Sequence, residues 1–143
     1  MIIKCVNNTG RFLRNYEIKE LKQEEFGRFG TSEYSEFGQL ELGKEYLAMG
    51  IIVFETYLSY IIDDNGFVSA CPCQLFESID SDIPSIWHFR LVNKDEEIFP
   101  HVQGIFGYPE LCHDKDSYFK LIIDREEQAT RIYFKRKAEV ESK

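Results

Sequence analysis

Three histidines and four cysteines are the residues of this chain best suited to bind a metal or attack a substrate. They are His88, His101, His113, Cys5, Cys71, Cys73 and Cys112. Their spacing is poor, because only one residue separates Cys71 from Cys73 and Cys112 is adjacent to His113, whereas a structural zinc ion needs four convergent ligands. No nucleophile-elbow sequence is present, and an acidic chain disfavours a reactive thiolate. We predict no metal site, no cofactor and no catalytic cysteine, and expect the thiols to pack in the core.

Paired carboxylates are a second group that could do acid–base chemistry. The pairs are Asp63 with Asp64, Asp80 with Asp82, and Asp95 with Glu96 and Glu97. Acid–base work or cation binding would require such a pair around a cleft that buries one member. All of them fall in predicted turns, where they should be solvated. The glycines also do not match the G-x-G-x-x-G phosphate loop, so the sequence predicts no enzyme.

The charge balance disfavours nucleic acid as a partner. The chain has 25 acidic and 17 basic residues, a formal net charge of -8. A negative surface repels phosphate backbones, but it attracts basic proteins and speeds encounter with them. The same composition is also typical of a protein whose charge serves solubility alone.

The chain shows no membrane or export signal. No apolar run approaches the roughly 20 residues that cross a bilayer. Residues 1–6 lack the charged start and long apolar stretch of a signal peptide, and are better explained as a first strand. We therefore expect a cytoplasmic protein with reduced thiols and no membrane partner.

Five short strands are predicted in the first 82 residues, and the aromatic content of 15% favours such β structure. They span residues 1–6, 43–53, 57–62, 67–71 and 76–79. Asn65 and Gly66 suit the type I′ turn of a two-residue hairpin. Pro72 should end the strand that follows, because it cannot donate to a ladder. Residues 73–75 suit a 3₁₀ turn, and the second strand could bulge near Gly50.

Outside these five strands, we predict an early excursion and a C-terminal part that contains both a strand and helices. Residues 11–42 are predicted to be a long excursion partly ordered by aromatic rings. Residues 83–143 should contain a strand at 87–92, an aromatic loop at 104–109 and two helices. Asp114 or Asp116 could cap the first helix, which would end at Ile123, and the second should span residues 124–140.

These elements predict an α+β protein. Residues 1–82 would form an SH3-like small β-barrel with the excursion at 11–42. Residues 83–143 would add a strand, a loop and two C-terminal helices packed on the barrel. The pattern leaves open whether this extension completes the barrel core or forms a separate subdomain.

Three stretches carry a resemblance to a known group of proteins. They are Gly43-Lys44-Glu45-Tyr46, Tyr60-Ile61-Ile62-Asp63-Asp64-Asn65-Gly66 and Leu75-Phe76-Glu77. This pattern resembles small bacterial SH3-like proteins of phage and toxin-immunity neighbourhoods, over residues 1–6 and roughly 40–80. The long excursion departs from it. The resemblance implies a non-catalytic immunity protein, of the contact-dependent-inhibition type, that neutralises a basic toxin domain.

In this interpretation, carboxylates steer a basic protein partner and nearby rings anchor it. The candidate partner-binding residues are Asp63, Asp64, Glu77, Asp80, Asp82, Tyr57, Tyr60 and Phe67. The acidic members should gather on one face. Trp87 is instead expected to pack between the barrel and the helices. The alternative function is an SH3-like adaptor or regulator that binds a basic peptide or protein through an aromatic groove.

Overall fold

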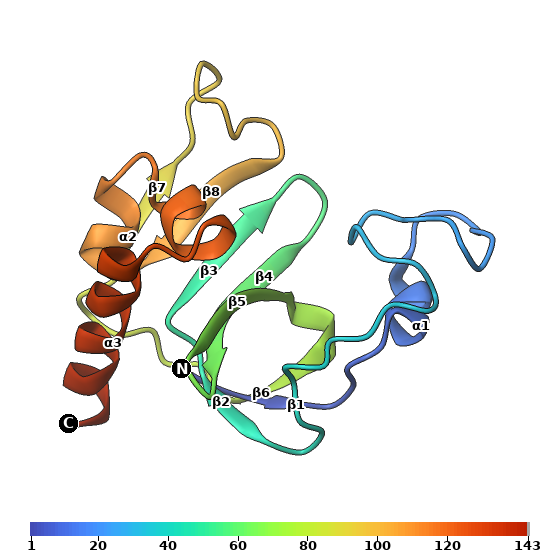
Figure 1. The fold of residues 1–143 in the computed structure, drawn as a ribbon, viewed down its shortest axis with the longest axis horizontal. Coiled ribbons are helices and arrows are strands. Elements are labelled where there is room, and N and C mark those ends of the chain that lie inside the picture. Colours follow the sequence, from blue (N-terminus) through green and yellow to red (C-terminus); the bar gives the residue numbers. More distant parts are fainter. Residues whose placement is uncertain (143) are drawn as a thin grey trace.

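The computed structural model describes residues 1–142 and is an α+β fold with two antiparallel sheets and C-terminal helices (Figure 1). The strands are β1 (Ile2–Cys5), β2 (Glu45–Leu47), β3 (Gly50–Phe54), β4 (Leu58–Asp64), β5 (Phe67–Pro72), β6 (Phe76–Asp80), β7 (His88–Leu91) and β8 (Val102–Gly107). The α-helices are α1 (Gly10–Leu13), α2 (Pro109–His113) and α3 (Glu127–Glu141). Two 3₁₀ turns, η1 (Arg14–Tyr16) and η2 (Cys73–Leu75), and a π-helical turn, η3 (Tyr118–Ile123), complete the set.

The strands form one three-stranded sheet in the order β2-β1-β6 and one five-stranded sheet in the order β5-β4-β3-β8-β7. The single strand expected at residues 43–53 is in fact two strands in different sheets. β2 pairs with β1, whereas β3 pairs with β4 and β8. Both sheets are open in the part of the chain that the structure describes, so the predicted closed barrel is not confirmed.

The hairpin between β4 and β5 has the turn that its sequence predicts. Asn65 and Gly66 both have positive φ, 50° and 86°, which is the type I′ requirement. Asp64 and Phe67 form the last cross-strand pair before the turn. The predicted strand end at Pro72 and the 3₁₀ turn at Cys73–Leu75 are also confirmed.

Residues 102–107 form a strand and not the predicted aromatic loop. β8 lies beside β3, so the C-terminal part of the chain extends the sheet that the first part begins. The glycines of β8 allow close packing. A Cβ on Gly104 would lie 2.9 Å from the Phe89 ring, and one on Gly107 would lie 2.7 Å from the Leu111 side chain.

The helices differ in part from the prediction. α3 corresponds to the helix expected at 124–140. The chain before it folds as two short turns, α2 and the π-helical η3, instead of one helix capped near Asp114. None of the helices in residues 1–142 is long and apolar enough to cross a bilayer.

Two hydrophobic cores hold the sheets in place. The first lies between the five-stranded sheet and the C-terminal helices, and includes Ile52, Ile105, Leu121 and Tyr133. The second lies between the two sheets and beneath the excursion. The excursion at residues 11–42 lies across the molecule from α2 and α3 (Figure 1). The helices therefore pack on the face of the five-stranded sheet to which Ile52 and Ile105 point.

Candidate functional site

The opposite face of the five-stranded sheet carries a set of apolar side chains in two cross-strand rows. In the first row, Ile51 pairs with Phe106 and Phe106 pairs with Phe89. The second row crosses the sheet through Leu58, Val53, Gly104 and Leu91. We call Ile51, Val53, Leu58, Trp87, Phe89, Leu91 and Phe106 the outer face. Neither core cluster of the described residues contains any of these seven side chains.

Aromatic rings hold the outer face together. The Phe106 ring lies 5.5 Å from Trp87 and 5.8 Å from Phe89, centroid to centroid. Phe89 and Leu91 are nevertheless 55% and 69% exposed, and Leu58 is 42% exposed. Single exposed apolar residues are common, but a contiguous apolar patch is a usual mark of a protein-interaction surface.

Exposed carboxylates flank the outer face along the chain. Asp80 is the last residue of β6, Asp82 lies on the connection from β6 to Trp87, and Asp95 and Glu97 follow β7. None of these four forms an ion pair within residues 1–142. An apolar centre with a charged, solvated rim is the usual anatomy of a protein interface.

The structure places two of the predicted steering residues in internal ion pairs. Asp63 accepts hydrogen bonds from the Tyr133 hydroxyl at 2.8 Å and from Lys137 Nζ at 2.9 Å, and its side chain is only 7% exposed. Asp64 pairs with Lys44 Nζ at 2.5 Å and is 11% exposed. The hydrogen bond to Asp64 raises the pKa of Lys44. These carboxylates fasten α3 and the chain before β2 to β4, and do not belong to an exposed acidic face.

The other predicted acids and rings divide between surface and core. Glu77, Asp80 and Asp82 are exposed. Tyr57 packs between Phe29 and Phe54 at 4.8 and 5.0 Å, and burial raises its pKa to about 12. Tyr57 is therefore half-buried and packs against both cores.

Tyr60 and Phe67 are closer to the surface than Tyr57, but both have intramolecular contacts. Tyr60 meets Phe76 edge-on at 5.7 Å, at the border of the second core. Phe67 is 45% exposed, and the Arg125 guanidinium lies 4.1 Å from the centre of its ring. The rings that gather on the surface are instead those of Trp87, Phe89 and Phe106. Trp87 thus lies beside Phe106 on the outer face, whereas we expected it from the sequence to pack between the barrel and the helices.

A sequence signal for the outer face exists in residues 87–91, where apolar and polar residues alternate. Such alternation normally places the apolar side chains towards the core. Here the apolar set faces out, and Arg90 points towards the helices, where it pairs with Glu96 at 2.6 Å. The alternation identifies the strand but not which of its faces is covered.

The thiols and imidazoles do not form a reactive pair in the described residues. Cys112 Sγ donates to the His88 carbonyl at 3.2 Å, and burial raises its pKa. The rings of His88 and His113 are 4.8 Å apart and exposed. Within residues 1–142, no group of three or more His, Cys, Asp or Glu side chains is arranged to hold a metal ion.

Thiol labelling checks this arrangement. Burial raises the pKa of Cys71 to about 11, which leaves about one thiol in a thousand ionised at pH 8. We expect iodoacetamide to modify half-buried Cys73 first, and Cys5, Cys71 and Cys112 only when the chain unfolds in urea. Peptide mass spectrometry over a time course gives the order, and native labelling of Cys71 as fast as Cys73 would contradict the burial described.

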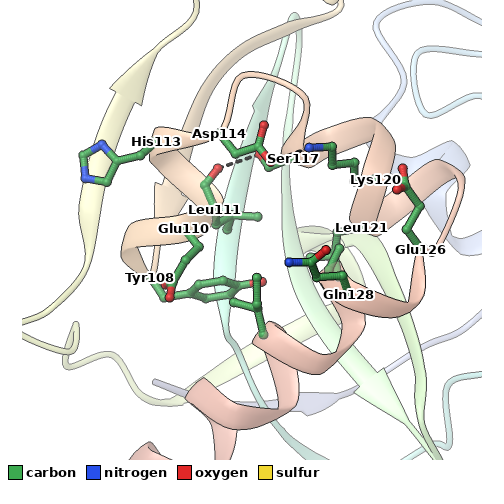
Figure 2. Close-up of a pocket in the computed structure, with 12 residues that line it drawn as sticks. Tyr108, Glu110, Leu111, His113, Asp114, Ser117, Lys120, Leu121, Glu126 and Gln128 are labelled. Atoms are coloured by element: carbon green, nitrogen blue, oxygen red, sulfur yellow. Dashed lines mark hydrogen bonds and ion pairs between the residues drawn. The ribbon is translucent and has the colours of Figure 1, made fainter.

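A separate cavity of about 440 Å³ lies between α2, η3 and α3 (Figure 2). Its apolar walls are formed by Leu111, Leu121 and Ile132. An ion pair between Asp114 and Lys120, 2.9 Å long, lies at the edge of the cavity. The Ser117 hydroxyl donates to the Leu111 carbonyl at 2.6 Å, and Figure 2 shows the His113 ring directed away from the other labelled side chains. The cavity can therefore hold a small apolar group, but it presents no activated nucleophile.

Comparisons with models of protein families, with curated proteins and with solved structures give no match to this chain.

Proposed function

We propose that this chain is a non-catalytic, cytoplasmic protein-binding inhibitor, an immunity-type protein that neutralises a basic partner by covering it with the outer face. The observation that carries the proposal is the uncovered apolar patch on β3, β8 and β7, with Phe89 and Leu91 more than half exposed. A buried aromatic or aliphatic anchor supplies most of the affinity in many protein complexes.

The charge of the chain supports a basic partner. At a net charge of -8, the chain attracts a cationic protein over a longer range than apolar contacts can act. Asp80, Asp82, Asp95 and Glu97 would lie at the rim of the interface, where charges mainly increase the association rate. A basic toxin domain, such as a nuclease that binds phosphate, has the complementary charge.

An SH3-like barrel over residues 1–82 is part of this proposal. The order β2-β1-β6 in one sheet and β5-β4-β3 in the other supports it, because β2 and β3 are consecutive in the chain yet lie in different sheets. The 3₁₀ turn η2 directly before β6 is a second point of support.

The second candidate function is an adaptor that binds a short basic peptide. The gathering of the Trp87, Phe89 and Phe106 rings favours it, since exposed rings are common in peptide grooves. The two functions differ in their partner. An inhibitor needs a folded basic domain for tight binding, whereas an adaptor should bind an isolated peptide of that domain equally well.

The test is a titration of this chain against the protein encoded beside its gene, together with co-expression of the two. The variant Phe89→Ser/Leu91→Ser should weaken the complex about 30- to 100-fold, because two central anchors are lost. Isothermal titration calorimetry gives the dissociation constant. The unaltered chain should also restore growth when the neighbouring protein is toxic, and the variant should not.

The matched control is Ile18→Ser/Phe26→Ser, which removes two apolar side chains that are 78% and 70% exposed on the excursion. This control should change the dissociation constant less than about threefold, as surface changes outside an interface usually do. Equal binding by the control and the outer-face variant would refute the proposed interface, and absence of any complex would refute the inhibitor function.

A further inference from the structure

β7 is an edge strand, and its hydrogen-bond register shows which of its backbone groups are unused. Val92 N–H donates to the Gln103 carbonyl at 3.0 Å, and Val92 continues the register in which Arg90 pairs with Ile105. In an antiparallel ladder, hydrogen-bonded and non-bonded pairs alternate along the strand. Residues 88, 90 and 92 therefore direct their backbone groups to β8, and those of Phe89 and Leu91 point away from the sheet.

The register on the other side of β8 gives the same result. Phe54 N–H donates to the Tyr57 carbonyl. Alternate residues of β3 therefore direct their backbone N–H and C=O groups to β4, and the intervening residues, including Ile51, direct theirs to β8. Ile51 pairs with Phe106. The backbone groups of Phe106 therefore point to β3, and those of its neighbour Ile105 point to β7. The unused edge of β7 thus belongs to the same two residues whose side chains are the most exposed of the outer face.

The two edges of the five-stranded sheet are protected to different degrees. On β5, Arg125 Nε donates to the Val68 carbonyl at 3.1 Å, and the same guanidinium covers the Phe67 ring. β7 has no proline, lysine or register shift, which are common devices against strand addition. Arg90 does not protect this edge, because its side chain pairs with Glu96.

We infer that β7 is the docking edge at which an extended segment of the partner adds as a sixth strand to the five-stranded sheet. The inference deepens the proposed function and rests on it. The segment would hydrogen-bond to the backbone of Phe89 and Leu91, and its side chains opposite these two residues would extend the apolar rows. A segment with apolar residues at two alternate positions fits this edge.

Charge selects a basic partner segment over a second copy of this chain. Two copies would each bring a net charge of -8, and antiparallel pairing of Phe89 with Leu91 would set Arg90 opposite its own copy, which is unfavourable. Basic residues of a foreign segment would instead be attracted by this net charge, and Asp95 and Glu97 flank Glu96, which pairs with Arg90 of β7.

The experiment uses the ¹⁵N-labelled full chain and the probe peptide acetyl-Lys-Lys-Val-Thr-Val-Lys-Lys-amide. In the free chain, the amides of Phe89 and Leu91 should exchange with solvent quickly and those of Arg90 and Val92 slowly. With about 2 mM peptide, exchange at Phe89 and Leu91 should slow at least about fivefold, while the amides of β5 stay unchanged. NMR hydrogen exchange measures each site.

N-methylation of the peptide provides matched controls. Methyl groups on both valine nitrogens block the bonds to β7 and should abolish the protection, whereas one on the threonine nitrogen, which points away, should preserve it. Leu91→Pro removes one outward donor without breaking a bond to β8 and should also abolish the protection, whereas Leu91→Ala should retain part of it. If Leu91→Pro does not fold, the comparison of the methylated peptides still tests whether the peptide hydrogen-bonds to β7.

Three results would overturn the inference: no protection by the unmodified peptide, equal protection by the valine-methylated peptide, or protection that follows dimerisation of the chain in the absence of peptide. These results are distinguishable from failure of the proposed function. A neighbour-encoded protein whose complex is weakened by the outer-face variant, but leaves the Phe89 and Leu91 amides exposed, would preserve the inhibitor function and refute strand addition.

Discussion

Replacing Tyr133 with alanine should lower the free energy of unfolding by about 3–5 kcal/mol, the usual cost of deleting a buried aromatic ring. Tyr133 is fully buried on α3, with its ring 6.3 Å from Tyr108 and 5.0 Å from Phe134. The ring fills the space between α3 and the five-stranded sheet, so its removal would leave a cavity at the centre of the first core. Urea unfolding followed by circular dichroism measures the loss.

The conservative variant Tyr133→Phe separates packing from hydrogen bonding. It keeps the ring and removes only the hydroxyl that donates to Asp63 at 2.8 Å, so the expected loss is about 1–2 kcal/mol. Asp63 would retain Lys137 as a partner. A loss below about 1.5 kcal/mol for the alanine variant would contradict the central place of this ring in the core.

Replacing Asp63 with alanine should cost about 2–4 kcal/mol of stability. Removal of one partner from a fully buried ion pair costs about 3–5 kcal/mol, and the value is reduced here because Lys137 is 22% exposed. The change would also remove the acceptor of the buried Tyr133 hydroxyl. The same urea unfolding measurement applies.

Asp82→Ala is the matched control, since Asp82 is an exposed carboxylate without an ion pair in the described residues. Its stability change should stay within about 0.5 kcal/mol. The comparison tests two roles for Asp63, which the sequence marks as a steering residue for a partner. If Asp63→Ala leaves stability unchanged and slows association with a basic partner, the steering role is correct and the structural role is wrong.

The extension at residues 83–143 changes where the candidate site lies. The predicted site belonged to the first 82 residues, but the outer face takes Trp87, Phe89, Leu91 and Phe106 from the extension and places them beside β3. Its helices cover one face of the sheet, and the other face stays open over β3, β8 and β7, beyond the part that the second core covers. The extension thus completes the first core and at the same time creates the exposed surface.

Elements whose causes are local could be predicted from the sequence. Asn65 and Gly66 specify their turn because both adopt positive φ readily, and Pro72 ends β5 because it lacks an amide hydrogen. The acidic first turn of α3 and its apolar stripe of Ile132 and Tyr133 likewise predict that helix within a few residues. In each case the deciding interaction spans only a few positions of the chain.

Which surfaces and charges are free depends on contacts between segments that are distant in the chain. Asp63 is 74 residues from Lys137, and Asp64 is 20 residues from Lys44, so no local pattern shows that these carboxylates are paired. The alternation at residues 87–91 is the same whichever face of β7 is covered. Exposure of Phe89 and Leu91 follows from the placement of α2, η3 and α3 on the other face of the sheet, and that placement depends on packing between segments distant in the chain.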